Sequence, residues 1–262
     1  MTLALVLVFC TTAQAQTDAQ GPEVLSEALS EGFTAKDAGP LHELLRDWNS
    51  DSSAVTSDRL TKKPAFEQAV YSLYPAFFVP VASQVDAEYL TVQSTVEVRL
   101  VAGNLAAAYQ KELETVGEHA RSMTSISEIT IRDFRPQLAV KGKEVLYLDD
   151  RRVHAILRFL TGKSIALDRY WDEPNGFYDF TDKYVERKRR LEYLNCVLGI
   201  VPGHWGTGWH LATHPEITCL VLASDLKTAV VYFRHGYGGG VALLSSKDNK
   251  WVVTHREKTW VE

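Results

Sequence analysis

The spacing of hydrophobic residues changes near Pro80, from the period of a helix to the alternation of a β-strand. Before this point, apolar side chains recur three and four residues apart over 41–48 and again over 66–77, which predicts two amphipathic helices. Over 89–101 polar and apolar residues alternate, which is typical of a strand with one face in water. The chain therefore needs a fold that packs helices against a sheet.

Shorter patterns predict further elements. The other expected helices cover 24–29, 184–194 and the segment with the apolar stripe Val153, Ile156, Leu157 and Leu160. The other expected strands before residue 150 cover 126–131 and 145–148. Gly32 is expected to end the first helix and Gly162 the one with the apolar stripe, which Asp149 or Asp150 caps at its start. A loop rich in serine, aspartate and asparagine is expected over 49–57.

The last third of the chain is expected to form a sheet. Four consecutive strands are expected at 217–222, 228–233, 241–244 and 251–254. The segment 247–250 predicts the hairpin between the last two. The strand at 228–233 has apolar residues on both faces, which indicates a central strand covered on both sides. Together these patterns predict an α+β fold, with N-terminal amphipathic helices and a C-terminal curved antiparallel sheet packed on helices.

The length of 262 residues suits one large domain or two modest ones. The expected organisation is a signal peptide at 1–15, a region of helices and strands at 16–165, and the antiparallel sheet region at 166–262. Nothing between the last two regions resembles a flexible linker. One continuous domain and two packed halves therefore both remain open.

The first fifteen residues differ from the rest of the chain. Leu3 to Phe9 is an unbroken apolar run, and Ala13-Gln14-Ala15 offers the small residues that signal peptidase needs. This pattern predicts a leader cut after Ala15 and export to the periplasm or the extracellular space. No Lys or Arg precedes the run, so a buried N-terminal strand is the alternative. Lipid anchoring at Cys10 is less favoured, because Phe9 stands where a lipid-attachment signal requires a small residue.

Composition argues against two classes of partner. The formal net charge is −5 and charged residues make up 23% of the chain, so nucleic acid is not an expected partner. After the leader, no stretch approaches the ~20 apolar residues that span a bilayer, so no transmembrane segment is expected. The mature chain is expected to be soluble.

Two cysteines remain after the expected leader, Cys196 and Cys219, each between apolar neighbours. In an oxidising compartment they can pair as a disulfide. The other interpretation is that both are core residues on neighbouring strands. The sequence does not choose between the two.

The C-terminal segments carry a resemblance to a known superfamily. Ala229 to Arg234 is followed by a glycine-rich run at 236–240, by Trp251 and by the ending Trp260-Val261-Glu262. This order resembles the closing strands of the NTF2-like superfamily, which implies a curved sheet wrapped around helices. Because that fold serves both enzymes and binding proteins, the resemblance implies no single function. Three other segments, 145–148, 158–160 and 203–206, resemble uncharacterised exported bacterial proteins.

Three histidines, His204, His210 and His214, lie close together in the sequence, and imidazole is a common metal ligand. On a strand that rises ~3.3 Å per residue, the last two would lie roughly 13 Å apart. Zinc ligands must converge within about 2 Å of the ion. Glycines before this segment and Pro215 after it argue against a helix that would bring them together. No metal site is therefore expected unless a distant carboxylate completes one.

A ligand pocket is the better interpretation of this region. Indole rings offer apolar area with a polar N–H, and glycines permit close approach of a ligand to the backbone. The alternative is that the same aromatic residues only pack within the sheet. The glycines at 238–240 are expected in a turn, a bulge or a close backbone approach, with a wide hairpin turn favoured. The residues expected to contact the ligand are His204, Trp205, Trp209, His210, Arg234, His235 and Tyr237.

No catalytic residue is assigned, because the usual hydrolase, zinc-protease and dinucleotide motifs are absent from the sequence. No cofactor is expected either. The acidic residues of 168–182 offer paired carboxylates for glycoside hydrolysis, but they also suit a solvated loop. The leading hypothesis is a non-enzymatic exported protein that binds a small molecule, a glycan or a protein partner. The alternatives are an exported hydrolase with a His–carboxylate site that only the fold assembles, and an envelope assembly or structural component.

Overall fold

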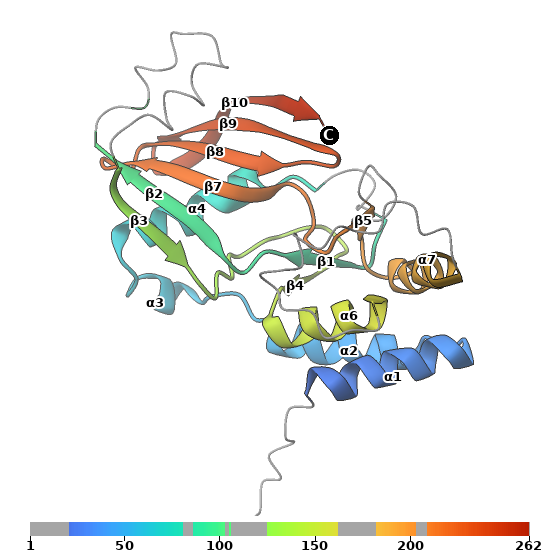
Figure 1. The fold of residues 1–262 in the computed structure, drawn as a ribbon. Coiled ribbons are helices and arrows are strands. Elements are labelled where there is room, and N and C mark those ends of the chain that lie inside the picture. The colour runs from blue at the N-terminus through green and yellow to red at the C-terminus, as the bar shows by residue number, and fades with distance from the viewer. Residues whose placement is uncertain are drawn as a thin grey trace, which may run out of the picture.

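The computed structural model describes residues 21–80, 86–102, 105, 125–161, 182–202 and 209–261 (Figure 1). The expected signal peptide at 1–15, with Cys10 inside it, lies outside the described residues. The same holds for Gly162 and for most of the acidic segment at 168–182.

The expected helices are present in the described part of the chain, as α1 (Pro22–Ala35), α2 (Gly39–Asp51), α4 (Ala65–Phe77), α6 (Asp150–Thr161) and α7 (Asp182–Asn195). A short helix that was not expected, α3 (Ser57–Leu60), lies between α2 and α4. Of the two candidate caps of α6, Asp149 is the one whose carboxylate accepts the backbone N–H of Arg152, at 2.9 Å. The expected loop at 49–57 is shorter than predicted, because α2 continues to Asp51 and the short α3 begins at Ser57.

Gly32 does not end α1, contrary to expectation. The helix continues to Ala35, and Lys36 then caps it in the left-handed conformation, with φ 56°. A Cβ atom on Gly32 would lie 2.8 Å from the hydroxyl of Tyr193. The glycine therefore permits close packing within the helical layer, and the end of the helix is set four residues later.

The strands form one large sheet and two small ones. They are β1 (Tyr89–Val92), β2 (Val96–Val101), β3 (Ser125–Ile131), β4 (Glu144–Tyr147), β5 (Val201–Pro202), β6 (Trp209–His210), β7 (Glu216–Ala223), β8 (Thr228–Arg234), β9 (Gly238–Lys247) and β10 (Lys250–Val261). The large sheet has the order β10-β9-β8-β7-β2-β3, while β1 pairs with β4 and β5 pairs with β6. The α+β class is thus confirmed, and the large sheet takes strands from both expected regions of the chain.

The segment 89–101 forms two strands and not the single one expected. β1 runs parallel to β4, whereas β2 joins the large sheet, antiparallel to β3 and parallel to β7. The break falls at Gln93, whose side-chain amide donates to the carbonyls of Thr95 and Ile217, each at 2.9 Å. The large sheet is therefore mixed, since the β2–β7 pair is parallel and its other pairs are antiparallel.

The main hydrophobic core lies between α4 and one face of the large sheet (Figure 1). Phe77 of α4 meets Phe233 of β8 edge-to-face, with ring centroids 5.5 Å apart. Val231 on β8 and Tyr74 on α4 are fully buried in the same cluster. Burial of each such large side chain contributes about 1.5–3 kcal/mol to folding.

A second core holds α1, α2, α6 and α7 together below the small β1–β4 sheet (Figure 1). Trp48 of α2 is fully buried there, and its indole N–H donates to the carbonyl of Tyr147 at the end of β4, at 2.8 Å. Arg152 of α6 is buried beside it and forms ion pairs with Asp149 at 2.8 Å and Asp51 at 2.5 Å. The Trp48 bond joins the helical layer to β4, and the ion pair between Arg152 and Asp51 joins α6 to α2.

The predicted central strand at 228–233 and the predicted hairpin at 247–250 are both confirmed. Six of the seven residues of β8 are buried, and the five apolar ones pack into two different clusters, one on each face of the sheet. The hairpin at 247–250 is present, with Asp248 and Asn249 at φ 51° and 59°. Positive φ at both central residues matches the twist of the flanking strands, and these residue types tolerate that conformation.

The glycines at 238–240 lie inside β9 and not in a wide turn. The turn itself is short and occupies the preceding residues, with Gly236 at φ 65° and the N–H of His235 bonded to the carbonyl of Gly238 at 2.8 Å. A Cβ atom on Gly240 would lie 1.9 Å from the carbonyl oxygen of Glu257. Of the three expected roles, close backbone approach is therefore the one found at this glycine.

Cys196 and Cys219 are not joined in a disulfide. The alternative, two core cysteines on neighbouring strands, is also wrong. Cys196 is exposed just after α7, and Cys219 is half-buried on β7. Apolar neighbours in the sequence do not bury Cys196, because it follows the last turn of a charged helix.

Among the described residues, no helix combines the length and the hydrophobicity that a bilayer-spanning helix requires.

Candidate functional site

The candidate site begins in the segment between β6 and β7, which buried polar side chains hold against β1. Thr91 bonds this segment twice, because its hydroxyl donates to the carbonyl of Leu211 and its carbonyl accepts the N–H of Thr213 at 2.6 Å. The side-chain oxygen of Gln93 accepts the N–H of Ile217 at 2.6 Å. Thr91 and Gln93 are themselves buried, so their hydrogen bonds hold the backbone of this segment in place.

His210 and His214 come together in this segment, although the sequence predicted a wide separation. Their ring centroids are 5.0 Å apart, at an interplanar angle of 49°. The residues between them are not in a strand, and the His214–Pro215 peptide bond is cis. Glu216 completes the group, and one side-chain nitrogen or oxygen atom from each of the three residues lies within 4.8 Å of the others. We call these three residues the imidazole–carboxylate cluster.

One hydrogen bond fixes the protonation of His214. The backbone N–H of Gly236 donates to its Nδ1 at 2.8 Å, so Nδ1 carries a lone pair and no proton. The proton of the neutral ring is then on Nε2. His214 is fully buried and presents an N–H donor to its surroundings on that side. The same bond joins the β6–β7 segment to the β8–β9 turn.

The β8–β9 turn supplies the more exposed members of the site. Arg234 stands opposite Glu216 in the β7–β8 ladder and is half-buried. His235 is also half-buried and contacts the ring of Phe233 edge-to-face, with centroids 6.4 Å apart. Tyr237 is 43% exposed at the outer end of the turn. Side chains therefore become more accessible from His214 outward along the turn.

The histidine pKa values show that the site disfavours additional positive charge. Burial, and then the charge of Arg234, lower the pKa of His210 to about 4. Burial, followed by His210, His235 and Arg234, lowers the pKa of His214 to about 3. The pKa of His235 is also lowered, by burial and then by the nearby Lys258 and Arg256. All three rings are therefore neutral at pH 7.

Glu216 responds in the opposite direction. Burial raises the pKa of its carboxyl group above the ordinary value, and the positive charge of Arg234 offsets part of that effect. Glu216 and Arg234 are partners in the β7–β8 ladder, so the positive charge of Arg234 lies near the carboxyl group and favours its ionised form.

The cluster has the residue types and proximity of a metal site, but its electrostatics and hydrogen bonding fit one poorly. A metal bound at Nε2 of His214 needs the lone pair that the proton occupies in this tautomer. Metal-binding imidazoles usually donate from Nδ1, which is the reverse of the bond found here. A divalent ion would also lie near Arg234, whose positive charge already acts on both rings. The arrangement is better suited to hydrogen bonding than to coordination.

Three of the residues predicted to contact a ligand, His210, Arg234 and His235, lie near His214, and Tyr237 is on the same turn as His235. Trp209 lies in β6, where its backbone pairs with Pro202. The other two predicted residues, His204 and Trp205, lie outside the described residues.

Sequence reasoning missed Glu216 and left His214 out of the predicted site. It assumed an extended strand between the histidines and looked for a distant carboxylate, whereas the carboxylate is two residues away. Pro215 was the available signal, because proline disfavours both a helix and a central strand and so points to a bend.

Comparisons with models of protein families, with curated proteins and with solved structures found no match.

Proposed function

We propose that the protein is a non-enzymatic binding module, acting after export, which binds a small anionic ligand at the β8–β9 turn. The ligand class is a carboxylate or a phosphate, recognised mainly by Arg234 and His235. The curved-sheet arrangement proposed from the NTF2-like resemblance provides the scaffold. The observation that carries the proposal is the clustering of positive charge around three neutral imidazoles at one end of the sheet.

Burial lowers the pKa values of the three imidazole rings, and the basic groups that surround the rings lower these values further. Arg234 acts on His210 and His214, while Arg256 and Lys258 act on His235. Among the described residues, Glu216 is the carboxylate grouped with His210 and His214, and it pairs with Arg234 in the β7–β8 ladder. A ligand that adds negative charge is therefore more favourable at this site than one that adds positive charge.

The gradient of exposure assigns different roles to the residues. Arg234 and His235 are half-buried and Tyr237 is 43% exposed, so an incoming ligand contacts these side chains first. His214 has no exposed surface, so its role is to position the turn through the bond to Gly236. The guanidinium of Arg234, at the end of β8, can bond a carboxylate or a phosphate through two N–H groups.

Calorimetric titration with sodium phosphate and with citrate tests the proposal. Arg234→Gln should weaken binding of the preferred anion at least about tenfold, a loss of about 1.4 kcal/mol, because a charge-assisted bond is lost. Arg158→Gln is the matched control, since this arginine lies on α6, where it pairs with Glu23. The control should bind as the wild type does. A preference for citrate or for phosphate identifies the class of anion.

Two results would overturn the proposal. The first is that neither anion binds in the millimolar range, or that Arg234→Gln binds as tightly as the wild type. The second is one-to-one binding of Zn²⁺ that is lost on His210→Ala and on Glu216→Gln, which would make the cluster a metal site.

Acid–base catalysis is a second candidate, favoured by the closeness of Glu216 to two neutral imidazoles. An exported hydrolase would use Glu216 as the base or acid and the Nε2–H of His214 as a donor. Chromogenic esters and glycosides are suitable probes. Catalysis requires turnover by the wild type that Glu216→Gln abolishes while the urea midpoint stays within the range of the control variant.

A further inference from the structure

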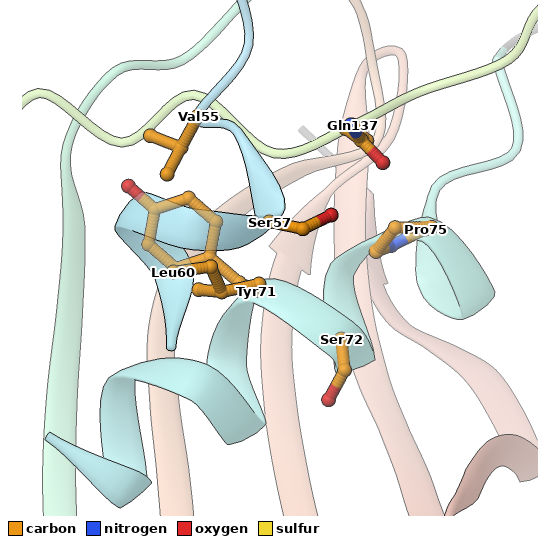
Figure 2. Close-up of a pocket in the computed structure, with 7 residues that line it drawn as sticks. All are labelled: Val55, Ser57, Leu60, Tyr71, Ser72, Pro75 and Gln137. Atoms are coloured by element: carbon orange, nitrogen blue, oxygen red, sulfur yellow. The ribbon is translucent and has the colours of Figure 1, made fainter. Parts of the chain in front are cut away.

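A cavity of about 240 Å³ lies away from the imidazole–carboxylate cluster, between α3, α4 and the segment before β4 (Figure 2). The residues that line it are Val55, Ser57, Leu60, Tyr71, Ser72, Pro75 and Gln137. An apolar cavity of about 150 Å³ is enough to bind benzene, so this one has room for a single ring with a substituent. It is smaller than the pockets that hold drug-sized ligands.

The walls of the cavity differ in character. Figure 2 shows the side chains of Val55 and Leu60 beside the ring of Tyr71, on the side away from Pro75 and Gln137. Ser57 lies between these two sides. A flat apolar molecule therefore meets aliphatic and aromatic surface on one side and a proline ring with polar neighbours on the other.

The aromatic wall is held in place before any ligand arrives. The hydroxyl of Tyr71 donates to the carbonyl of Asp133 and accepts the N–H of Arg135, each at 3.4 Å. Lys63 lies 5.3 Å from the centroid of the same ring. Because these contacts fix the ring, little of the binding free energy is spent on ordering it.

Pro75 removes one backbone hydrogen bond from α4 beside the cavity. It lies inside α4, and proline has no amide hydrogen to donate to the carbonyl four residues earlier. That carbonyl belongs to Tyr71, and both residues line the cavity. Pro75 is exposed, so the site of the missing bond is on the open side of the helix. A ligand with one N–H or O–H group can supply the bond that the helix lacks.

We propose that this cavity binds a small single-ring aromatic molecule with one hydrogen-bond donor, of the phenol or indole class. The ring packs between Leu60 and Pro75, and the donor bonds the carbonyl oxygen of Tyr71. The site is independent of the anion site at the β8–β9 turn, so either can fail alone.

Trp251 provides a reporter for the experiment, because its indole N–H donates to the hydroxyl of Ser72, a cavity residue, at 3.1 Å. The full chain, labelled with ¹⁵N, is titrated with phenol and separately with toluene, which has nearly the same shape and no donor. The Trp251 signal is assigned by its absence in Trp251→Phe. Wild-type protein should bind phenol about tenfold more tightly than toluene, because only phenol forms the bond to the carbonyl.

Pro75→Ala is the decisive variant. It restores the amide that the Tyr71 carbonyl lacks, so the urea midpoint should rise while the preference for phenol over toluene falls to near unity. Pro22→Ala, at the first turn of α1, is the matched control and should leave the preference unchanged. Leu60→Trp, which fills the cavity, should abolish binding of both probes.

Three outcomes would overturn the proposal: no response of the Trp251 signal to phenol in the wild type, the same preference in Pro75→Ala as in the wild type, or undiminished binding in Leu60→Trp. Because the comparison uses two probes on one folded variant, a general loss of stability cannot imitate the predicted loss of preference.

Discussion

The backbone N–H of Gly236 donates to Nδ1 of His214 over 2.8 Å, and this bond joins a turn at the end of the sheet to a buried imidazole. The two residues come from different loops, one before β7 and one between β8 and β9. The bond selects the tautomer of His214 and limits the movement of the turn that carries Arg234 and His235. The position of the proposed anion site and the protonation of the cluster thus depend on one contact.

Replacement of this acceptor should cost stability. His214→Phe keeps a ring of similar size but leaves the N–H of Gly236 without its acceptor, which is expected to lower the free energy of unfolding by about 1–3 kcal/mol. Urea denaturation measures the change. His255→Phe is the control, because that side chain is 43% exposed, and it should change stability by less than about 0.5 kcal/mol. Equal effects of the two variants would show that the bond between Gly236 and His214 contributes nothing to the free energy of unfolding.

Stability should fall as the pH is lowered from 7 toward 4. The pKa values of His210 and His214 are about 4 and about 3 in the folded chain, below the ordinary 6.5. Between these values the unfolded chain binds protons that the folded chain does not, so each histidine lowers the free energy of unfolding by about 1.4 kcal/mol per pH unit. The raised pKa of Glu216 acts in the opposite sense, since its folded carboxyl takes up a proton first.

Urea denaturation from pH 7 to pH 4 checks this dependence in the wild type and in His210→Phe. The variant should show a shallower slope below pH 6.5, because one titrating group has been removed. An unchanged slope would mean that His210 is protonated as easily in the folded chain as in the unfolded one.

Gly240→Ala should be strongly destabilising, because the new Cβ would lie 1.9 Å from the carbonyl oxygen of Glu257, and β9 and β10 would have to separate. We expect a loss of about 3 kcal/mol or more, measured by thermal or urea unfolding. Gly142→Ala provides the comparison. The new Cβ there would have no atom within 4 Å, and the only strain would come from the φ of 71°. The variant should therefore lose about 1 kcal/mol of stability. A smaller loss for Gly240→Ala than for Gly142→Ala would contradict the packing described here.

Trp48→Phe tests how the helical layer is attached to the strands. The variant keeps an aromatic ring but loses the bond from the indole N–H to the carbonyl of Tyr147, which is 2.8 Å long and buried. We expect a loss of about 2–4 kcal/mol, the sum of an unsatisfied carbonyl and a small cavity. Tyr89→Phe on β1 is a milder control. If Trp48→Phe were as stable as the wild type, this bond would not hold α2 to β4.

The sequence predicted most of the regular elements because their signals are local. The helices over 41–48 and 66–77 and the strand over 228–233 follow from hydrophobic spacing within a single segment. The division of 89–101 into two strands is different, because it depends on Gln93 bonding the backbone of Ile217 from far away in the chain. No local pattern contains such a contact, and the same holds for the parallel pairing of β2 with β7.

The candidate site was predicted only in part for a similar reason. Arg234, His235 and Tyr237 were predicted because a basic and aromatic run beside glycines is visible in the sequence, and the structure places them at the candidate site. The approach of His210 to His214 depends on a bend before Pro215 that Thr91 and Gln93 hold from another strand. The distance of 5.0 Å between the two ring centroids could not be predicted from the spacing of residues along an extended strand.

Imidazole ¹H–¹⁵N correlation NMR at pH 7, recorded with and without sodium phosphate, tests whether the β8–β9 turn binds an anion beside a His214 ring of fixed tautomer. His214 should carry its proton on Nε2 and keep that tautomer throughout, while phosphate should shift the resonances of His235 in a saturable way. A proton on Nδ1 of His214, or resonances of His235 that do not respond to phosphate or to citrate, would contradict this prediction.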